Sequence, residues 1–115
     1  MDFTEKMVNT RKVFEGKIFD IKVDDITLPD GRAAEREILL HPGGVVILPI
    51  TNDGKIILVK QYRYAVGKTL LEIPAGKLEK GEDPTEAAVR ELEEETGCRA
   101  VKIRKFGNLV PVAGY

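Results

Sequence analysis

Before residue 74 the chain shows partial alternation of apolar and polar residues at 13–19 and 21–28 and apolar runs at 45–50 and 56–59, patterns typical of β-strands. Two glycine-containing segments, Asp30-Gly31 and Asn52-Asp53-Gly54, lie between such runs and predict hairpin turns. The segments predicted as strands are 13–19, 21–28, 36–40, 45–50, 56–59, 70–73 and, later in the chain, 100–106. Because hairpins join neighbouring antiparallel strands, the sheet is expected to be largely antiparallel or mixed.

The pattern changes to the period of an α-helix over residues 84–96. Asp83 is a suitable N-cap, Pro84 suits the first helical position, and Gly97 is a suitable C-terminal stop. The apolar stripe expected to dock this helix on a core consists of Ala88, Val89 and Leu92. Strands followed by a single helix predict an α+β domain.

The predicted helix carries three glutamates on one side. Successive helical residues are about 100° apart, so Glu91, Glu94 and Glu95 fall on one arc of roughly 100°. Glu86 and Glu93 point elsewhere. Three carboxylates beside an apolar stripe repel one another, which helix stability alone does not favour. A hard divalent cation with oxygen ligands removes that repulsion, and Mg²⁺ suits a site that substrate phosphates complete.

Composition limits the remaining function classes. The 115 residues are enough for one domain with a modest core. Eighteen basic and nineteen acidic residues leave a net charge of −1, so nothing favours nonspecific nucleic-acid binding. Cys98 is the single cysteine, expected to be a buried small apolar group, and it indicates a reducing compartment. The sequence shows no signal peptide and no apolar run of membrane-spanning length, so we expect a cytoplasmic protein without a membrane partner.

The segment around the helix resembles the Nudix box, G-x5-E-x7-R-E-U-x-E-E-x-G-U, where U is a bulky aliphatic residue. The matching fixed positions are Gly76, Glu82, Arg90, Glu91, Leu92, Glu94, Glu95 and Gly97. A solvated acidic surface helix would explain neither the flanking glycines nor the arginine. A spaced pattern with eight matches rarely arises by chance. Cys98 takes the last U position, where it should affect packing more than chemistry.

This resemblance implies the α/β/α sandwich of Nudix domains. The chain is then expected to be a single Nudix domain, with N-terminal strands and a hairpin at 1–42 and an incomplete core at 43–115. The C-terminal strands and second helix of that fold would come from sequence beyond residue 115. We therefore expect either a fragment or a partner chain that supplies the missing cover, and a homodimer in solution.

Outside the box the chain is similar to the ADP-ribose pyrophosphatase branch of the family. The supporting segments are Val23-Asp24-Asp25, His41-Pro42-Gly43 and residues 59–64 and 71–76. The resemblance implies metal ligation by the carbonyl of Ala75 and the carboxylates of Glu91 and Glu95, with Glu94 as a further ligand. Arg90 is four residues before Glu94 and could pair with it on the helix face, so we expect Arg90 to orient these carboxylates. Glu82 precedes the helix and favours its positive end, so we expect it to give structural support with a minor metal role. The implied substrate-binding residues are Arg63 at the diphosphate, Glu72, and, near adenine, Tyr64 and Phe19.

The implied reaction is attack of water on one phosphorus of a nucleoside diphosphate linked to another group. Mg²⁺, or Mn²⁺ in its place, would be the cofactor, and ADP-ribose would give AMP and ribose 5-phosphate. Two departures keep alternatives open. The branch carries a proline in a turn after the box where this chain has Ala113, within Val112-Ala113-Gly114, and the glutamate often proposed as general base lies beyond Tyr115. The alternatives are a pyrophosphatase for NADH or a dinucleoside polyphosphate, and a catalytically weak nucleotide- or metal-binding module.

Overall fold

The computed structural model describes residues 1–111 and 113, so Val112, Gly114 and Tyr115 lie outside the described residues. The chain divides into two compact units, Met1–Pro42 and Gly43–Tyr115. Each unit contains its own hydrogen-bonded strands, and each is described separately below.

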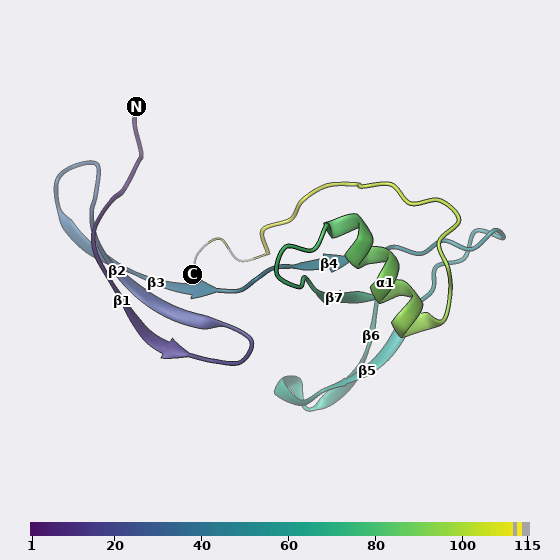
Figure 1. The fold of residues 1–115 in the computed structure, drawn as a ribbon. Helices are drawn as coiled ribbons and strands as arrows, with labels where there is room; N and C mark the ends of the chain where they lie inside the picture. Colours follow the sequence, from purple (N-terminus) through teal and green to yellow (C-terminus); the bar gives the residue numbers. More distant parts are fainter. Residues whose placement is uncertain (112, 114–115) are drawn as a thin grey trace. The chain divides into compact units, whose positions relative to one another are not determined.

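The first unit is one antiparallel sheet in which β2 lies between the other two strands (Figure 1). Its strands are β1 (Lys6–Glu15), β2 (Asp20–Thr27) and β3 (Ala33–Leu40). The turn between β2 and β3 confirms the hairpin predicted from Asp30-Gly31. Gly31 has a φ of 87° and donates its N–H to the carbonyl of Leu28 at 2.9 Å. Glycine adopts this left-handed conformation without steric cost, which explains its place in the turn.

The strand predicted at 13–19 is right only for residues 13–15. β1 ends at Glu15, and the chain then turns, with the N–H of Gly16 donating to the carbonyl of Phe19 at 3.1 Å. Two register shifts interrupt the pairing of β1 with β2, between Met7 and Asn9 and between Lys12 and Phe14. An extra residue at a bulge reverses the faces of the residues after it, so the alternation of β1 is not visible in the sequence.

Among its described residues, the second unit contains two short antiparallel strand pairs, one 3₁₀ turn and one helix (Figure 1). β4 pairs with β7, and β5 pairs with β6. The elements are β4 (Gly44–Val46), β5 (Val59–Arg63), η1 (Tyr64–Val66), β6 (Lys68–Glu72), β7 (Ala75–Lys77) and α1 (Pro84–Thr96). An isolated bridge between Ile50 and Ile56 closes the second predicted turn. The strands predicted at 45–50 and 56–59 are therefore largely wrong in extent, and three-residue β7 is too short to show a period in the sequence.

The prediction for α1 is confirmed at both ends. The Asp83 side chain accepts the backbone N–H groups of Thr85 and Glu86 at 3.0 and 3.1 Å. Gly97 has a φ of 70° and donates its N–H to the carbonyl of Glu93 at 2.9 Å. These contacts satisfy terminal backbone groups that have no partner within the helix.

The core of the second unit lies where α1 packs on β4 and β7 (Figure 1). Its buried residues are Val45, Ile47, Ala87 and Leu92, with Leu78, Ala88 and Ala100 packed around them. The predicted stripe is right for Ala88 and Leu92. Ala87 is fully buried and was missed, while Val89 is only half-buried. The docking face is thus centred one residue earlier than the sequence pattern indicated.

The strand predicted at 100–106 is wrong, because this segment has no regular secondary structure in the part of the chain described. Its apolar residues Val101 and Phe106 are almost completely exposed. Alternation alone does not make a strand, since a strand also needs a neighbour for its backbone hydrogen bonds. Cys98 is exposed rather than buried. Among the described residues no helix is both long and apolar enough to cross a membrane.

Candidate active site

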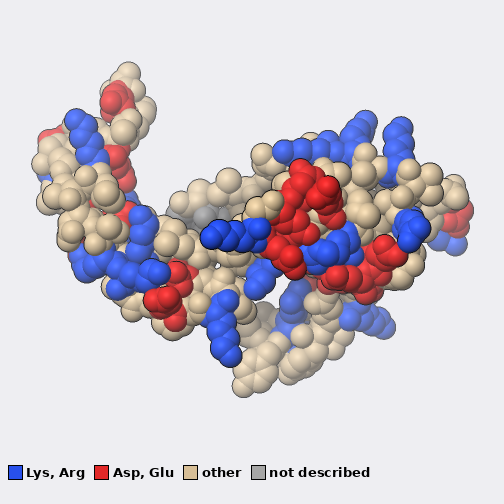
Figure 2. Space-filling model, in the orientation of Figure 1, with Lys and Arg blue, Asp and Glu red and all other residues tan. Residues whose placement is uncertain are grey.

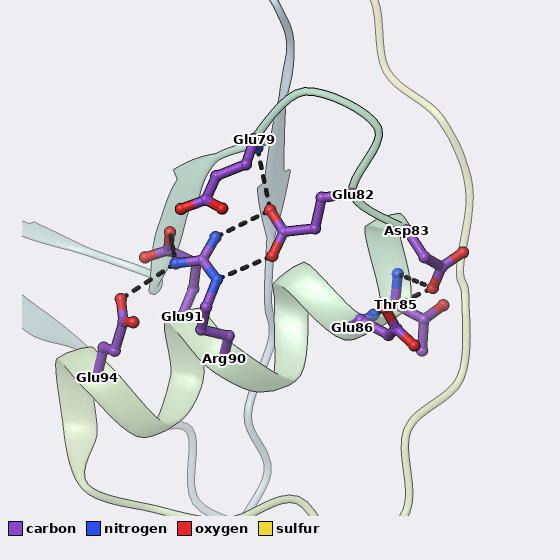
Figure 3. Close-up of polar contacts among 8 residues, drawn as sticks. All are labelled: Glu79, Glu82, Asp83, Thr85, Glu86, Arg90, Glu91 and Glu94. Carbon is purple, nitrogen blue, oxygen red and sulfur yellow. Dashed lines mark hydrogen bonds and ion pairs between the residues drawn. The ribbon is translucent and has the colours of Figure 1, made fainter.

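Arg90 of α1 is held by the loop that leads into the helix. Its Nε and Nη2 donate to the two carboxylate oxygens of Glu82 at 2.8 and 3.0 Å (Figure 3). Glu82 also accepts the backbone N–H of Glu79 at 3.0 Å. The hydrogen bond from Arg90 lowers the pKa of Glu82 and raises that of Arg90. A two-point contact of this kind fixes the orientation of the guanidinium as well as its position.

The remaining side of the same guanidinium contacts two more carboxylates. Nη1 of Arg90 donates to Oε1 of Glu91 at 2.9 Å and to Oε2 of Glu94 at 3.2 Å (Figure 3). One positive charge therefore serves three carboxylates, which we call the Arg90 cluster: Glu82, Glu91 and Glu94 with Arg90. The cluster retains an excess of negative charge, and Figure 2 shows acidic side chains gathered over α1 with basic ones between them.

Glu91 lies against the backbone of β7. A Cβ atom added at Gly76 would stand 1.9 Å from Cδ of Glu91 and 2.2 and 2.3 Å from its two oxygens. These distances are far shorter than any van der Waals contact, so only glycine leaves room for this carboxylate at its present place. The glutamate side chain is 13% exposed. The box glycine and the box glutamate therefore fit each other sterically.

Glu95 faces a different neighbour. Its Oε1 accepts Nε2 of Gln61 on β5 at 3.4 Å, a long contact. Its Oε2 is buried and has no hydrogen-bond partner among residues 1–111 and 113. Buried carboxylate oxygens are nearly always paired, because desolvation of an unpaired charge is costly. This unpaired oxygen is therefore available to a cation or a hydrogen-bond donor.

Arg63 at the end of β5 pairs with Glu72 at the end of β6. Nε of Arg63 donates to Oε1 at 2.8 Å and Nη2 donates to Oε2 at 2.6 Å. This pairing lowers the pKa of Glu72 and raises that of Arg63, and the charge of Glu95 raises the pKa of Arg63 further. Arg63 thus lies within electrostatic reach of the acidic helix in the same unit.

Comparison with known proteins decides the family. The NUDIX domain model matches residues 40–115, and the model of the nucleoside diphosphate sugar hydrolase N-terminal domain matches residues 5–39. The chain belongs to the Nudix family. The match spans the Arg90 cluster, Gly76 and Glu95, and it confirms the family predicted from the box.

Individual Nudix relatives resemble most of this chain. It is 54% identical over 111 residues to an ADP-ribose pyrophosphatase of Bacillus subtilis, covering 96% of this chain and 60% of that protein. It is 54% identical over 95 residues to a methanol dehydrogenase activator of Bacillus methanolicus, covering 83% of this chain and 51% of that protein. The chain therefore spans half to three-fifths of the length of these relatives.

A solved structure has the same fold. The crystal structure of an ADP compounds hydrolase superposes with a TM-score of 0.76 at 27% identity, covering 89% of this chain and 56% of that one. The prediction of an α+β Nudix fold, with strand pairs and the box helix, is confirmed.

The donor set of this Nudix site fits a divalent cation. The described residues contain no group of three or more acidic, histidine or cysteine side chains already arranged around one point. Arg90 binds Glu91 and Glu94, while Glu95 turns towards Gln61. Mg²⁺ needs only one or two carboxylates when phosphates and water supply the other ligands. The orphaned oxygen of Glu95 and the Gly76 space around Glu91 match that requirement.

The other predicted site residues lie in several places. Ala75 is on β7, opposite Val46 of β4. Tyr64 begins η1 and is 90% exposed. Phe19 belongs to the first unit, where its ring packs on that of Phe14 with centroids 5.8 Å apart. Ala113 is exposed, and the turn in which it was predicted to lie includes residues outside those described.

Two contacts of the site were missed from the sequence. Gln61 contacts Glu95, although 34 residues separate them. Arg90 binds Glu82, whereas sequence reasoning paired Arg90 only with Glu94. The eight-residue separation of Glu82 and Arg90 within the box was visible, but it gives no helical neighbour relation, because a loop lies between them.

Proposed function

We propose that this chain carries the catalytic machinery of a divalent-metal-dependent hydrolase that splits ADP-ribose into AMP and ribose 5-phosphate. The observation that carries the proposal is the buried, unpartnered oxygen of Glu95 on the helix that also carries Arg90, Glu91 and Glu94. A relative named ADP-ribose pyrophosphatase, 54% identical over 96% of this chain, supports the choice of substrate. Nudix hydrolases generally use a divalent metal ion, and we propose Mg²⁺, with Mn²⁺ as a substitute.

The residues divide into three roles in this proposal. The carbonyl of Ala75 and the carboxylates of Glu91 and Glu95 hold the cation, and Glu94 gives a further contact. Arg90 orients the carboxylates, because it binds Glu82 through two nitrogens and Glu91 and Glu94 through the third. Arg63 is the proposed contact at the diphosphate, with Glu72 bound to it, and Tyr64 is the proposed contact at adenine.

The net reaction needs a nucleophile and groups that neutralise the negative charge of the phosphoryl oxygens. A water oxygen forms a bond to one phosphorus while the bridging P–O bond breaks, and the proton released from water ends on one of the two monophosphates. A bound divalent cation supplies positive charge that neutralises phosphoryl oxygens and lowers the pKa of water. Arg63 adds a second positive group that offers parallel N–H donors to phosphate oxygens.

A second substrate class is favoured by one residue. Ala113 stands where the ADP-ribose branch carries proline, so NADH or a dinucleoside polyphosphate is the alternative substrate. A metal-dependent nucleotide-binding module with weak catalysis is the alternative outside enzymes.

The direct experiment is incubation of the chain with Mg²⁺ and each of ADP-ribose, NADH and diadenosine polyphosphate, with the products separated by chromatography. We expect AMP and ribose 5-phosphate in equal amounts from ADP-ribose, and no release in EDTA. Faster cleavage of NADH or the dinucleotide would assign the alternative substrate. Saturable nucleotide binding without products would assign the binding module.

We also propose a homodimer in the cytoplasm. The first unit exposes large apolar side chains that a second copy could cover: Met7, Val8, Val13, Phe14, Ile18 and Leu39. Sedimentation equilibrium should give twice the chain mass of 12.8 kDa. A stable, folded species of single mass would contradict the dimer.

A further inference from the structure

The two side chains of the Arg63–Glu72 ion pair differ in their exposure to solvent. Both residues lie on the hairpin of β5 and β6, and both belong to the same compact unit as α1. The Glu72 side chain is 22% exposed, whereas the Arg63 side chain is 50% exposed. The carboxylate is therefore the more enclosed partner, and the guanidinium is the one that a ligand can reach.

The atoms that form the pair leave a defined part of the guanidinium open. Glu72 accepts hydrogen bonds from the side edge of the guanidinium, which is formed by Nε and Nη2. The end edge, formed by Nη1 and Nη2, is left open. A guanidinium has five N–H donors, so three remain: both on Nη1 and one on Nη2. Within residues 1–111 and 113, Nη1 of Arg63 donates no hydrogen bond that would occupy this end. The end edge thus presents two parallel N–H groups, the geometry that matches two oxygens of a phosphate.

The charge of Glu72 argues against direct contact with the substrate diphosphate. A carboxylate and a phosphate repel each other, and Glu72 already uses both oxygens to accept from Arg63. An arginine held at one edge loses less conformational freedom when a ligand binds at the other. The Glu72 carboxylate also partly offsets the positive charge of Arg63. Glu72 would therefore favour ligand binding by orienting Arg63 and not by adding charge.

We propose that Glu72 is a positioning residue, which binds the side edge of Arg63 so that the end edge is aimed at the diphosphate of the substrate. Glu72 does not itself contact substrate. The inference rests on the proposed function, because it takes Arg63 as the ligand of the diphosphate.

A double-mutant cycle tests the proposal in the full chain. The variants are Glu72→Gln, Arg63→Ala and the double variant, with Glu35→Gln on β3 as a control. Glu35 is also held by an arginine, at 2.6 Å from Nη2 of Arg11, and it lies in the first unit. Calorimetric titration with ADP-ribose in EDTA gives the dissociation constant without turnover, and Mg²⁺-dependent AMP release gives KM and kcat.

The effect of Glu72→Gln on binding should depend on the presence of Arg63. Arg63→Ala should weaken binding about tenfold or more, since it removes hydrogen bonds to a charged ligand. Glu72→Gln should weaken binding about two- to tenfold in the presence of Arg63, mainly through KM, and should have no further effect in the Arg63→Ala background. Glu35→Gln should leave both constants unchanged. A smaller folded fraction would lower apparent kcat and leave KM alone, so the KM effect separates positioning from folding.

Three results would overturn the inference while leaving the proposed function intact, provided the wild type releases AMP. The first is an undiminished effect of Glu72→Gln in the Arg63→Ala background, which would mean direct contact with substrate. The second is tighter binding by Glu72→Gln, which would mean that Glu72 competes with the ligand. The third is unchanged binding by Arg63→Ala. If the wild type neither binds ADP-ribose nor releases AMP, the proposed function fails and the inference fails with it.

Discussion

The carboxylates of the N-terminal sheet and those of α1 differ in how their charge is balanced. In the sheet, Asp20 pairs with Lys12 at 2.9 Å, and Asp24 pairs with Lys22 at 2.7 Å. At α1, Arg90 is shared by Glu91 and Glu94 of the helix and by Glu82 of the preceding loop, and Glu95 keeps a buried oxygen without a partner among the described residues. Figure 2 shows red and blue surfaces intermixed in both regions, and the two regions differ in how these charges are paired.

This difference shows which acidic residues hold the strands together and which are available for chemistry. Exposed ion pairs in a sheet stabilise it only slightly, but they leave no group in need of a ligand. The buried sheet residue Asp24 is also fully paired: it is 6% exposed and is satisfied by Lys22 and Thr10 together. The carboxylates of α1 are left incompletely satisfied, which costs stability unless a cation is bound. Incomplete pairing, rather than acidity, marks the candidate site.

The largest expected effect comes from neutralising the unbalanced carboxylates. Glu91→Gln and Glu95→Gln should each lower hydrolysis at least about 100-fold, because each change keeps the side-chain shape but removes the charge that holds a cation. Glu93→Gln is the matched control on the same helix, since among the described residues the Glu93 side chain pairs only with exposed Arg99, at 3.3 Å. Asp25→Asn is the control in the sheet. AMP release measures all four, and equal losses would remove the distinction between the two regions.

The steric fit of Gly76 with Glu91 gives the next effect. Gly76→Ala should displace the Glu91 carboxylate and lower hydrolysis about 10- to 100-fold, because small displacements of catalytic groups are costly. The obstructing atoms are the end of a flexible side chain, so the melting temperature should change little. Gly107→Ala is the control, since a Cβ there meets nothing within 4 Å. Loss of folding with Gly76→Ala would show that Gly76 serves the strand pair and not the glutamate.

Arg90 should be sensitive even to replacement by lysine. Arg90→Lys keeps the charge but loses the two-nitrogen contact with Glu82, so hydrolysis should fall about tenfold. The melting temperature should fall as well, since the loop before α1 is tied through that contact. Arg99→Lys is the matched control, at an arginine whose side chain is 81% exposed. Equal behaviour of the two variants would mean that the Arg90 cluster is an ordinary surface pairing.

The smallest expected effect is the loss, as pH falls, of the stability that the Arg90–Glu82 ion pair contributes to the fold. Arg90 lowers the pKa of Glu82 below its ordinary value of 4.5 in the folded chain. A group with a lowered pKa stabilises the fold above its ordinary pKa, and this contribution is lost as pH falls through the lowered value. The melting temperature of the wild type should therefore exceed that of Glu82→Gln by a few degrees at most near pH 6. The difference should shrink towards about pH 3, and a constant difference would contradict the assigned cause.

Local signals allowed the helix and its ends to be predicted, whereas non-local pairing did not appear in the sequence. Asp83, Pro84 and Gly97 act on neighbouring backbone groups, so their effect can be inferred from position. The register shifts of β1 could not be inferred, because a bulge depends on how two strands meet. For the same reason, a strand at 100–106 was predicted where no partner strand is described.

The candidate site divides in the same way. The spacing of the box identified Glu91, Glu94 and Glu95 as a group on one helix. The contact of Gln61 with Glu95 and that of Arg63 with Glu72 depend on the packing and register of the β5–β6 hairpin. The sequence could name Arg63 and Glu72 through a family resemblance, but it could not show that they bind each other.

Titration of the chain with Mn²⁺, followed by electron paramagnetic resonance of the free ion, tests the central claim most directly. The claim is that the incompletely paired carboxylates of α1 form a divalent-cation site. Wild type should bind Mn²⁺ saturably, Glu91→Gln and Glu95→Gln should bind at least about tenfold more weakly, and Glu93→Gln and Asp25→Asn should bind like wild type. Mg²⁺ should displace the bound Mn²⁺. Absence of saturable binding by the wild type, or equal binding by all five proteins, would contradict the claim.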